Sequence, residues 1–531
     1  GKELVKGEPD ASSFPNGGLR ATCEARGYTA WDPTSYAFVK DGVLCIPTAF
    51  CSYNGEALDK KTPLLRSMSA LSTQACRILK LFGKEVEHVS TTVGAEQEYF
   101  LVRKEDYETR QDLILTGRTL FGAMPAKGQE LEEHYFGTLR PIVSEYMEDL
   151  DNQLWELGIP AKTKHNEVAP CQHELAPIFD TTNIAVDHNL LTMEMMKKVA
   201  EKHGLVCLLA EKPFEGVNGS GKHNNWSMTA NGVNLLDPGD TPMENLQFLI
   251  FLAAVIKAVD QYQDLLRAAV ASPGNDHRLG ANEAPPAIIS MFVGDDLAAV
   301  LDAISNDAEY ADPGRQRIDL GVDVLPKFKK DNTDRNRTSP FAFTGNKFEF
   351  RMPGSSMNLA DANTVHAAPA MTSEKNIALF EEMGVLSRVE VMSRYEVIIE
   401  HYAKVLHIEA MTMLEMANKQ LIPAATAYMS DVASAAAAKM AVSEKLSCKA
   451  ENKVLEKLSA ATDAMSDAVD ALDAAVESAE SETDSLEKAK AYRDKVLPAM
   501  ADLRTNADAA EVVCGEDYWP LPGYSKMLYY V

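Results

Sequence analysis

The segment GAEQEYF, residues 94–100, places two glutamates two positions apart within a stretch that predicts a β-strand. Side chains at positions i and i+2 of a strand point to the same face of the sheet. Glu96 and Glu98 therefore share one face, while Gln97 and Tyr99 point to the other. This alternation predicts a strand with one acidic face and one face that packs against a core.

The same alternation occurs in two later segments, SGKHNNWSM (220–228) and NKFEFRMP (346–353). The side chains on the polar face are His223, Asn225 and Ser227 in the first segment, and Lys347, Glu349 and Arg351 in the second. Large apolar side chains occupy the opposite face of both. The two segments predict further strands of the same sheet, with chemically active groups on one side.

A fourth segment, KHNEVAPCQHEL (164–175), carries Glu167 and Glu174 seven residues apart. Pro170 lies between them and favours a turn, which would bring the two carboxylates together. Cys171, in the same turn, could be a ligand or a nucleophile, although a small packing residue is the better interpretation.

Each of these segments alone is also compatible with a solvated strand face. Together they supply five glutamates and one histidine, which are too many like charges to lie close together without a cation. Hard divalent cations bound by oxygen resolve this repulsion. A ligand set so rich in carboxylate favours Mg²⁺ or Mn²⁺ over zinc, and the single imidazole suits Mn²⁺.

Composition limits the function. The chain has 531 residues and a formal net charge of −26, which argues against a nucleic-acid partner. Its longest apolar run, Phe248–Ile256, is too short to cross a bilayer, so no membrane is expected. Eight cysteines without a CxxC pair indicate reduced thiols and a cytoplasmic location. Residue 1 is Gly rather than Met, and we expect an N-terminal truncation.

The pattern of apolar residues predicts an α+β protein in three parts. Residues 1–60 are expected to form part of a small β-rich domain. Residues 61–371 alternate strands and helices and would form the central domain. Residues 372–531 are almost entirely helical, with a hairpin at about 426–514.

Apolar residues in the last part repeat with the three-four spacing of a coiled-coil seam. They are Leu458, Met465, Val469, Leu472, Val476, Ala479 and Leu486. A helical hairpin packed on the body explains this seam better than a recognition module, and Pro498 is expected to break it. The aromatic segment YWPLPGYSKMLYY (518–530) is expected to dock on the rest of the chain.

A phosphate-binding loop is a weaker alternative for one segment. Gly216, Gly221 and Lys222 match the spacing G-x-x-x-x-G-K, but His223 replaces the Ser or Thr that such a loop needs for Mg²⁺.

These motifs, in their order along the chain, resemble the metal- and substrate-binding segments of the glutamine synthetases. The match covers roughly residues 10–355 and includes GAEQEYF, HNEVAPCQHE, NGSGKHNNWS and FEFRMP. FPNGGLRATCEARGYTAWDP (14–33), HRLGANEAPP (277–286) and the long helical region resemble the type III class.

The resemblance implies a partial β-grasp N-terminal domain and a glutamine synthetase-like catalytic domain, in which helices surround a curved antiparallel sheet. It implies ATP-dependent ligation of ammonia to L-glutamate through γ-glutamyl phosphate, with two Mg²⁺ or Mn²⁺ ions per site. The substrates would be ATP, L-glutamate and ammonium. A dodecamer of two hexameric rings is implied, with active sites between subunits.

The resemblance also assigns roles to residues. The metal nearer glutamate would be held by Glu98, Glu167 and Glu174, and the metal that bridges the ATP phosphates by Glu96, His223 and Glu349. Glutamate would be bound by Asn218, Gly219, Arg278 and Arg351. The nucleotide would contact Phe179, Asn225, Ser227 and Lys347.

Three further residues are implied in catalysis. Glu283 would close the site and accept a proton from ammonium. Arg337 would stabilise the transferring phosphoryl group. Asp10, in the motif DASS, would bind ammonium, although Ala11 replaces the glycine of the family's D-G-S-S loop.

Three other functions remain compatible with the sequence. A γ-glutamyl ligase that acts on another amine would carry the same metal strands. A non-catalytic scaffold could retain the fold, and a metallohydrolase could use the same ligand cluster.

Overall fold

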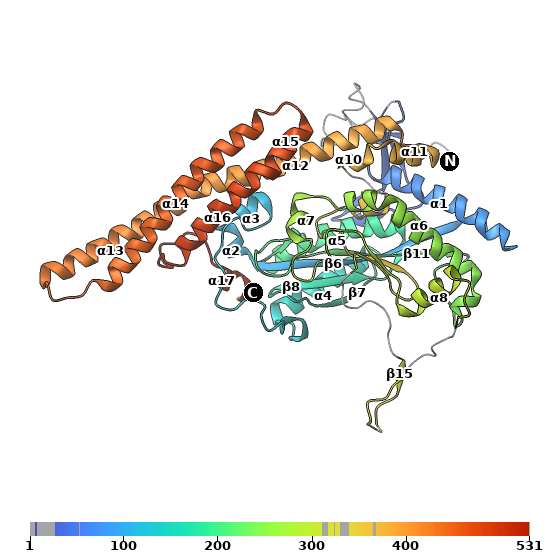
Figure 1. The fold of residues 1–531 in the computed structure, drawn as a ribbon, viewed down its shortest axis with the longest axis horizontal. Helices are drawn as coiled ribbons and strands as arrows, with labels where there is room; N and C mark the ends of the chain where they lie inside the picture. The colour runs from blue at the N-terminus through green and yellow to red at the C-terminus, as the bar shows by residue number, and fades with distance from the viewer. Residues whose placement is uncertain are drawn as a thin grey trace.

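The computed structural model describes residues 6–7, 27–52, 54–310, 317–322, 324–329, 339–364 and 368–529. It shows a large sheet with packed helices, and a helical C-terminal part that extends away from this body as a long rod (Figure 1). The predicted α+β class is confirmed. None of the described helices is long and apolar enough to cross a membrane.

The main sheet has the strand order β13-β16-β17-β11-β6-β8-β7. Strands β9 and β10 also pair with β6, and β12 pairs with β11. All these pairings are antiparallel except β13 with β16. The strands are β6 (Val89–Arg103), β7 (Ala161–Asn166), β8 (Gln172–Pro177), β9 (Asp180–Thr181), β10 (Leu205–Leu208), β11 (Lys222–Ala230), β12 (Val233–Asn234), β13 (Met291–Phe292), β16 (Phe341–Phe343) and β17 (Phe348–Phe350).

Strand β6 is the longest strand of the sheet. Its side chains alternate between buried and half-buried positions as far as Glu96, and then all are buried from Gln97 to Val102. The half-buried positions, such as Gly94 and Glu96, lie on the polar face, as the alternation predicts. One face of the central sheet is therefore open to a polar site.

Four long helices cover the opposite face. They are α1 (Lys61–Leu81), α4 (Pro141–Glu156), α5 (Thr182–Lys202) and α6 (Leu246–Ala268). Tyr99 packs with residues of α4 and α5, and Val93 packs with residues of α1 and α5. Met228 joins the core formed with α1 and α6. Burial of these apolar side chains fixes the register of the strands, because a slip by one residue would move them to the polar face.

The N-terminal part contains two small sheets. Strands β1 (Lys6–Gly7), β2 (Gly27–Trp31) and β5 (Thr48–Ser52) form one, and β3 (Phe38–Lys40) and β4 (Val43–Cys45) form a hairpin. Further short elements of the described chain are α2 (Lys104–Glu108), α3 (Gln111–Thr116), η3 (His134–Phe136), η4 (Pro242–Glu244), α7 (Pro273–Arg278), α8 (Asp295–Ser305), β14 (Arg317–Ile318), β15 (Phe328–Lys329), α9 (Leu359–Thr364), α10 (Ala368–Met371) and α11 (Glu374–Glu382).

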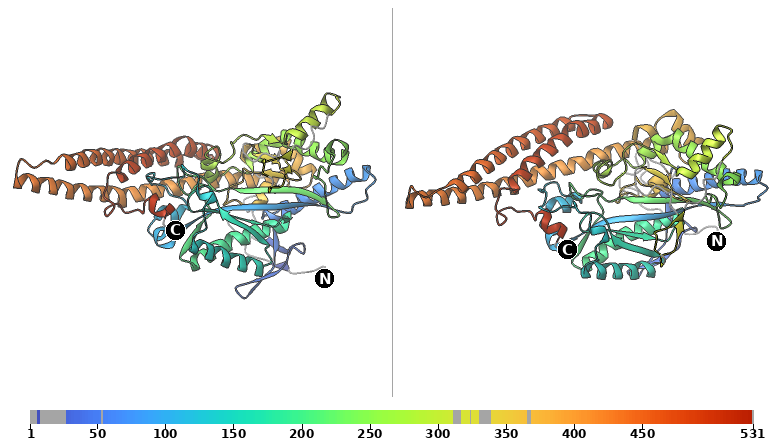
Figure 2. Two further views of the ribbon diagram at one scale, coloured as in Figure 1. Left: turned by 90° about the horizontal axis from the view of Figure 1, so that it is seen from below. Right: turned by 60° about the horizontal axis from the view of Figure 1, so that its bottom comes forward.

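The C-terminal rod consists of helices that lie side by side in both views of Figure 2, all of them long except α15. They are α12 (Arg388–Met416), α13 (Ile422–Val442), α14 (Lys449–Glu480), α15 (Ser485–Ala491) and α16 (Leu497–Glu511). All residues of the predicted seam except Leu486 are buried in one core. The predicted helical hairpin is thus confirmed.

The expected break at Pro498 is wrong. A π-helical turn, η6 (Tyr492–Val496), joins α15 to α16, and Pro498 lies in the first turn of α16. Proline cannot donate a hydrogen bond to the preceding turn, and a wider π-turn just before it tolerates this loss. Pro423, in the first turn of α13, likewise follows a π-turn, η5 (Ala417–Leu421).

The aromatic segment after α16 returns to the body, where α17 (Tyr524–Tyr529) lies close to the main sheet (Figure 1). Tyr524, Met527 and Leu528 are buried in the same core as Tyr99. The expected docking of this segment is confirmed.

Candidate active site

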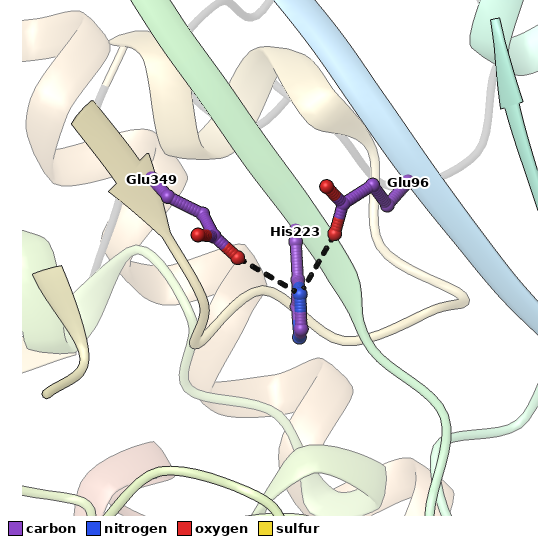
Figure 3. Close-up of side chains that lie close together, drawn as sticks. All are labelled: Glu96, His223 and Glu349. Atoms are coloured by element: carbon purple, nitrogen blue, oxygen red, sulfur yellow. Dashed lines mark ion pairs between the residues drawn. The ribbon is translucent and has the colours of Figure 1, made fainter. Parts of the chain in front are cut away.

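Three neighbouring strands bring Glu96, His223 and Glu349 together (Figure 3). Register pairs His223 directly with Glu96, and Asn225 with Glu349. The His223 Nδ1 atom lies 2.9 Å from Glu96 Oε2 and 3.3 Å from Glu349 Oε1. Ligand atoms of the three residues lie within 4.8 Å of one another, and we call this group the first cluster.

The electrostatics of the first cluster favour a positive charge. Burial acts to lower the pKa of His223, but the carboxylates of Glu349 and Glu96 outweigh it and raise the pKa to about 10. Burial acts to raise the pKa of Glu349, but His223 and Arg351 hold it well below its usual range. A site that holds an imidazolium between two carboxylates suits a bound cation.

A second cluster lies at the hairpin of β7 and β8. His165 pairs in register with Glu174, and its Nε2 atom lies 3.2 Å from Glu174 Oε1. Its Nδ1 atom lies 3.7 Å from Oε1 of Glu167, which follows the end of β7. Cys171, buried in the connecting turn, has a φ of +55°, and this turn brings the two glutamates together. Burial raises the pKa of the Cys171 thiol, which fits a packing role.

The charges of the second cluster are also coupled. The hydrogen bond to Glu174 raises the pKa of His165 to about 9, although burial acts to lower it. Burial raises the pKa of Glu174, which the neighbouring His165 opposes. Ligand atoms of His165, Glu167 and Glu174 lie within 4.8 Å of one another.

Glu98 lies between the two clusters. Its Oε1 atom is 3.8 Å from Nε2 of His223, and register places it opposite Glu174. Its Oε2 atom accepts a hydrogen bond of 2.7 Å from the Gly221 amide and a longer one of 3.4 Å from Gln172. The carboxylate is therefore fixed in position between both groups of ligands.

Both clusters line one cavity of about 360 Å³. Its lining residues are Glu96, Tyr135, His165, Glu167, Glu174, His223, Asn225, Thr344, Lys347, Glu349 and Arg351. Nearly all are polar or charged, so the cavity is suited to charged ligands rather than to an apolar one.

A loop beside the cavity carries Asn218 and Gly219. The Asn218 side chain accepts a hydrogen bond of 3.1 Å from the Glu283 amide and donates one of 3.3 Å to the Glu283 carboxylate. A Cβ atom at Gly219 would lie 2.5 Å from the carbonyl oxygen of Glu211, so only glycine permits this approach. The structure thus joins Asn218 directly to Glu283.

The two arginines differ in their contacts. Arg351 is buried, lines the cavity and donates a hydrogen bond of 3.0 Å to Glu349. Arg278 is equally buried, but it is not among the residues that line the cavity. It donates to the carbonyl oxygens of Met352 at 3.1 Å and Arg351 at 3.2 Å. In this structure it therefore braces the chain that follows β17.

The predicted nucleotide positions lie along the polar face. Asn225 and Lys347 line the cavity. Ser227 lies two residues beyond Asn225 on β11 and donates a hydrogen bond of 2.7 Å to Asn234. Phe179, between β8 and β9, is 65% exposed and offers an open aromatic face.

Two predicted residues, Asp10 and Arg337, lie outside the described residues. Three that the sequence prediction missed, Tyr135, His165 and Thr344, line the cavity. His165 had a signal in the sequence, since it precedes Glu167 by two positions as Glu96 precedes Glu98. The alternative phosphate-binding loop is wrong, because Lys222 begins strand β11 and is buried.

Comparison with known proteins identifies the family of this chain. Three protein-family models match the chain: "Glutamine synthetase type III N terminal" at residues 1–67, "Glutamine synthetase, catalytic domain" at 75–290, and "Glutamine synthetase C-terminal domain" at 357–440. A glutamine synthetase from Butyrivibrio fibrisolvens is 47% identical over 95% of this chain and 82% of its own length. The chain belongs to the type III glutamine synthetase family.

Other relatives extend the match over the whole chain. The type-3 glutamine synthetase of Dictyostelium discoideum is 43% identical over 100% of this chain and 83% of its own length. A glutamine synthetase from Bacteroides fragilis is 40% identical over the same shares. As a member of the glutamine synthetases, the chain is an ATP-dependent ligase that forms glutamine from glutamate and ammonia.

Proposed function

We propose that glutamine synthesis takes place in the 360 Å³ cavity on the polar face of the sheet. The observation that carries this proposal is that two clusters of carboxylate and imidazole ligands line the same cavity. The reaction joins two anions, the terminal phosphate of ATP and the glutamate side chain, before ammonia attacks the acyl phosphate. A site for this chemistry needs cations close to both.

Each cluster would hold one divalent ion. The first cluster, Glu96, His223 and Glu349, would hold the ion that contacts the ATP phosphates. Glu98, Glu167 and Glu174 would hold the ion nearer glutamate, with His165 positioning Glu174 from the edge strand. The oxygen-rich ligand sets favour Mg²⁺ or Mn²⁺. When bound, the ions supply positive charge that offsets repulsion between phosphate and carboxylate.

The nucleotide would lie along the polar face of β11. Phe179 offers an aromatic face for the adenine, and Lys347 supplies a positive charge at the cavity wall. Asn225 and Ser227 supply hydrogen-bonding groups on the same strand face. The ATP site would then lie next to the first cluster.

Glutamate would lie near the second cluster. Asn218 and Gly219 would bind it from the loop, and Arg351 from the cavity wall, while Arg278 supports the chain that carries Arg351. Asn218 is hydrogen-bonded to Glu283, so Glu283 would lie beside the substrate, where its carboxylate would accept a proton from ammonium. The roles of Arg337 and Asp10 stay predictions.

The assembly and location of the protein are part of the same proposal. We infer a dodecamer of two hexameric rings with active sites between subunits. In support, Leu131 and Phe136 are 70% and 89% exposed in the segment that carries Tyr135 to the cavity rim. Apolar side chains so exposed next to a site favour cover by a neighbouring subunit. The dispersed cysteines support a cytoplasmic location.

We also propose a division of the chain into residues 1–60, 61–371 and 372–531. The separate family matches to an N-terminal, a catalytic and a C-terminal part support this division. The helical hairpin at about 426–514 belongs to the last part.

An assay of ADP release tests the function directly. We expect release that depends on glutamate and ammonium together, with either Mg²⁺ or Mn²⁺ supplied. A panel of amines in place of ammonium tests the acceptor. A strong preference for another amine would contradict glutamine synthesis, and release without glutamate would contradict the substrate assignment.

A further inference from the structure

The loop from Glu211 to Gly221 lies between β10 and β11 and carries the proposed glutamate ligand Asn218, so we call it the substrate loop. The ends of the loop are joined by a hydrogen bond of 2.8 Å from the Ser220 amide to the Glu211 carbonyl, and Lys212 donates another to the Val217 carbonyl. The loop also contacts a segment far away in the sequence, the aromatic segment that contains α17.

The Tyr524 hydroxyl is the first of these contacts. It lies 2.6 Å from the Thr119 hydroxyl, 2.8 Å from an Arg504 nitrogen and 3.2 Å from the Glu215 amide. Thr119 donates its only hydroxyl hydrogen to the Pro213 carbonyl at 2.7 Å. Tyr524 must therefore donate to Thr119 and accept from both Arg504 and Glu215. The hydroxyl therefore uses its one donor and both acceptor positions. One partner, Glu215, lies in the loop, and another, Thr119, is bonded to Pro213 of the loop.

The Tyr524 ring is fixed by packing, in addition to the hydrogen bonds of its hydroxyl. The ring is buried and meets the Phe214 ring edge-on, with the ring centroids 5.3 Å apart. The ring also lies against Gly122, where a Cβ atom would come within 2.3 Å of it. The Tyr524 ring is thus confined by Gly122 and by Phe214 at the start of the substrate loop.

Tyr529 supplies a second contact. Its hydroxyl donates to the Gly128 carbonyl, and its own carbonyl accepts a hydrogen bond of 2.7 Å from Arg140. The residue after Gly128 is Gln129, whose side-chain oxygen accepts a hydrogen bond of 2.7 Å from the Asn218 amide. Tyr529 therefore supports the backbone next to Gln129, whose side chain accepts the hydrogen bond from the Asn218 amide.

We propose that Tyr524 and Tyr529 are positioning residues for glutamate binding, which act through the loop that carries Asn218. The proposal rests on the proposed role of Asn218 as a glutamate ligand. The two tyrosines act at different points: Tyr524 holds the backbone three residues before Asn218, and Tyr529 holds the chain next to Gln129. Glutamate affinity would then depend on a segment about 300 residues later in the sequence.

The test is steady-state kinetics of the full-length enzyme with Tyr524→Phe. This change keeps the ring but leaves the Glu215 amide without its partner, so the loop loses its defined position. We expect the KM for glutamate to rise by about tenfold, with the KM for ATP and kcat changed by less than about twofold. Tyr529→Phe should raise the glutamate KM in the same direction by a smaller factor, and it carries the test if Tyr524→Phe does not fold.

The matched control is Tyr518→Phe. Tyr518 belongs to the same aromatic segment, but its hydroxyl donates to Asp431 on α13, away from the substrate loop. This variant should keep both KM values. An equal change in the control would overturn the proposal, as would a lower melting temperature of Tyr524→Phe with an unchanged glutamate KM.

Asn218→Ala separates this proposal from the proposed function. If Asn218→Ala raises the glutamate KM and both tyrosine variants leave it unchanged, the positioning role is wrong and the substrate assignment stands. If Asn218→Ala itself leaves the glutamate KM unchanged, the assignment of Asn218 is wrong and the positioning role falls with it.

Discussion

The two ligand clusters are built from different parts of the sheet. The first cluster comes from three neighbouring interior strands of the sheet, β6, β11 and β17, each of which is paired on both sides. In the second cluster Glu174 lies in an interior strand, but His165 belongs to the edge strand β7 and Glu167 to the turn after it.

This difference predicts different tolerance to change. Interior strands are fixed by hydrogen bonds and by buried side chains on their other face, such as Phe348 and Phe350 on either side of Glu349. A turn at an edge has fewer such restraints. We therefore expect the first cluster to be the more rigid of the two and the more sensitive to substitution.

The largest effect should come from Glu349→Ala. Loss of this carboxylate removes a proposed ligand and leaves His223 and Arg351 short of a partner. Because a bound metal is worth several kcal/mol to such a reaction, we expect kcat to fall by about 10³-fold or more. The measurement is ADP release dependent on glutamate and ammonium. Glu456→Ala, an exposed change on α14, is the control and should keep full activity.

Glu98→Gln should have the next largest effect. The glutamine retains an acceptor for the Gly221 amide but lacks the charge that a second ion needs. We expect activity to fall by about 10²-fold, and the number of bound Mn²⁺ ions, counted by electron paramagnetic resonance, to fall from two to one. Retention of both ions would show that Glu98 is not a ligand.

His165→Asn decides how the second cluster is built. If His165 positions Glu174, as proposed, both ions should still bind and activity should fall by about 10- to 100-fold, as for other residues that support metal ligands. If the variant instead binds a single Mn²⁺ ion, His165 is itself a ligand. The same count on Glu98→Gln provides the comparison.

Gln172→Met should have the smallest effect of the four. Gln172 is fully buried and donates to the Gly219 carbonyl at 3.0 Å and, more weakly, to Glu98 at 3.4 Å. Methionine keeps the volume and removes these hydrogen bonds. We expect about a 2- to 10-fold loss of activity. If Gln172→Met lost as much activity as Glu349→Ala, the expected difference in sensitivity between the two clusters would be wrong.

The sequence predicted those features that depend on local periodicity. Alternation along a strand placed Glu96, His223 and Glu349 on one face, and the three-four repeat located the helical seam. The strand periodicity could be read because apolar and polar side chains alternate along β17 and from Trp226 to Thr229 of β11. The same spacing of two positions separates His165 from Glu167, but β7 has no alternating apolar residues to mark it as a strand with one buried face.

Other features depend on contacts that no local pattern reveals. The π-turn before Pro498 accommodates the missing proline donor, whereas the sequence shows only a helix-breaking residue. The aromatic composition predicted that the segment around Tyr524 would dock, but not where. The position of its hydroxyl is set by Thr119, Arg504 and Glu215, which come from three distant parts of the chain.

The contact between Tyr524 and Glu215 also sets an order of events during synthesis. The two residues are 309 positions apart. At about 5–20 residues per second, roughly 15–60 s separate the synthesis of the substrate loop from that of the tyrosine that supports it. Glu349, the last of the proposed metal ligands, is made within this interval. A growing chain therefore contains every proposed metal ligand before it contains the hydroxyl that holds its substrate loop.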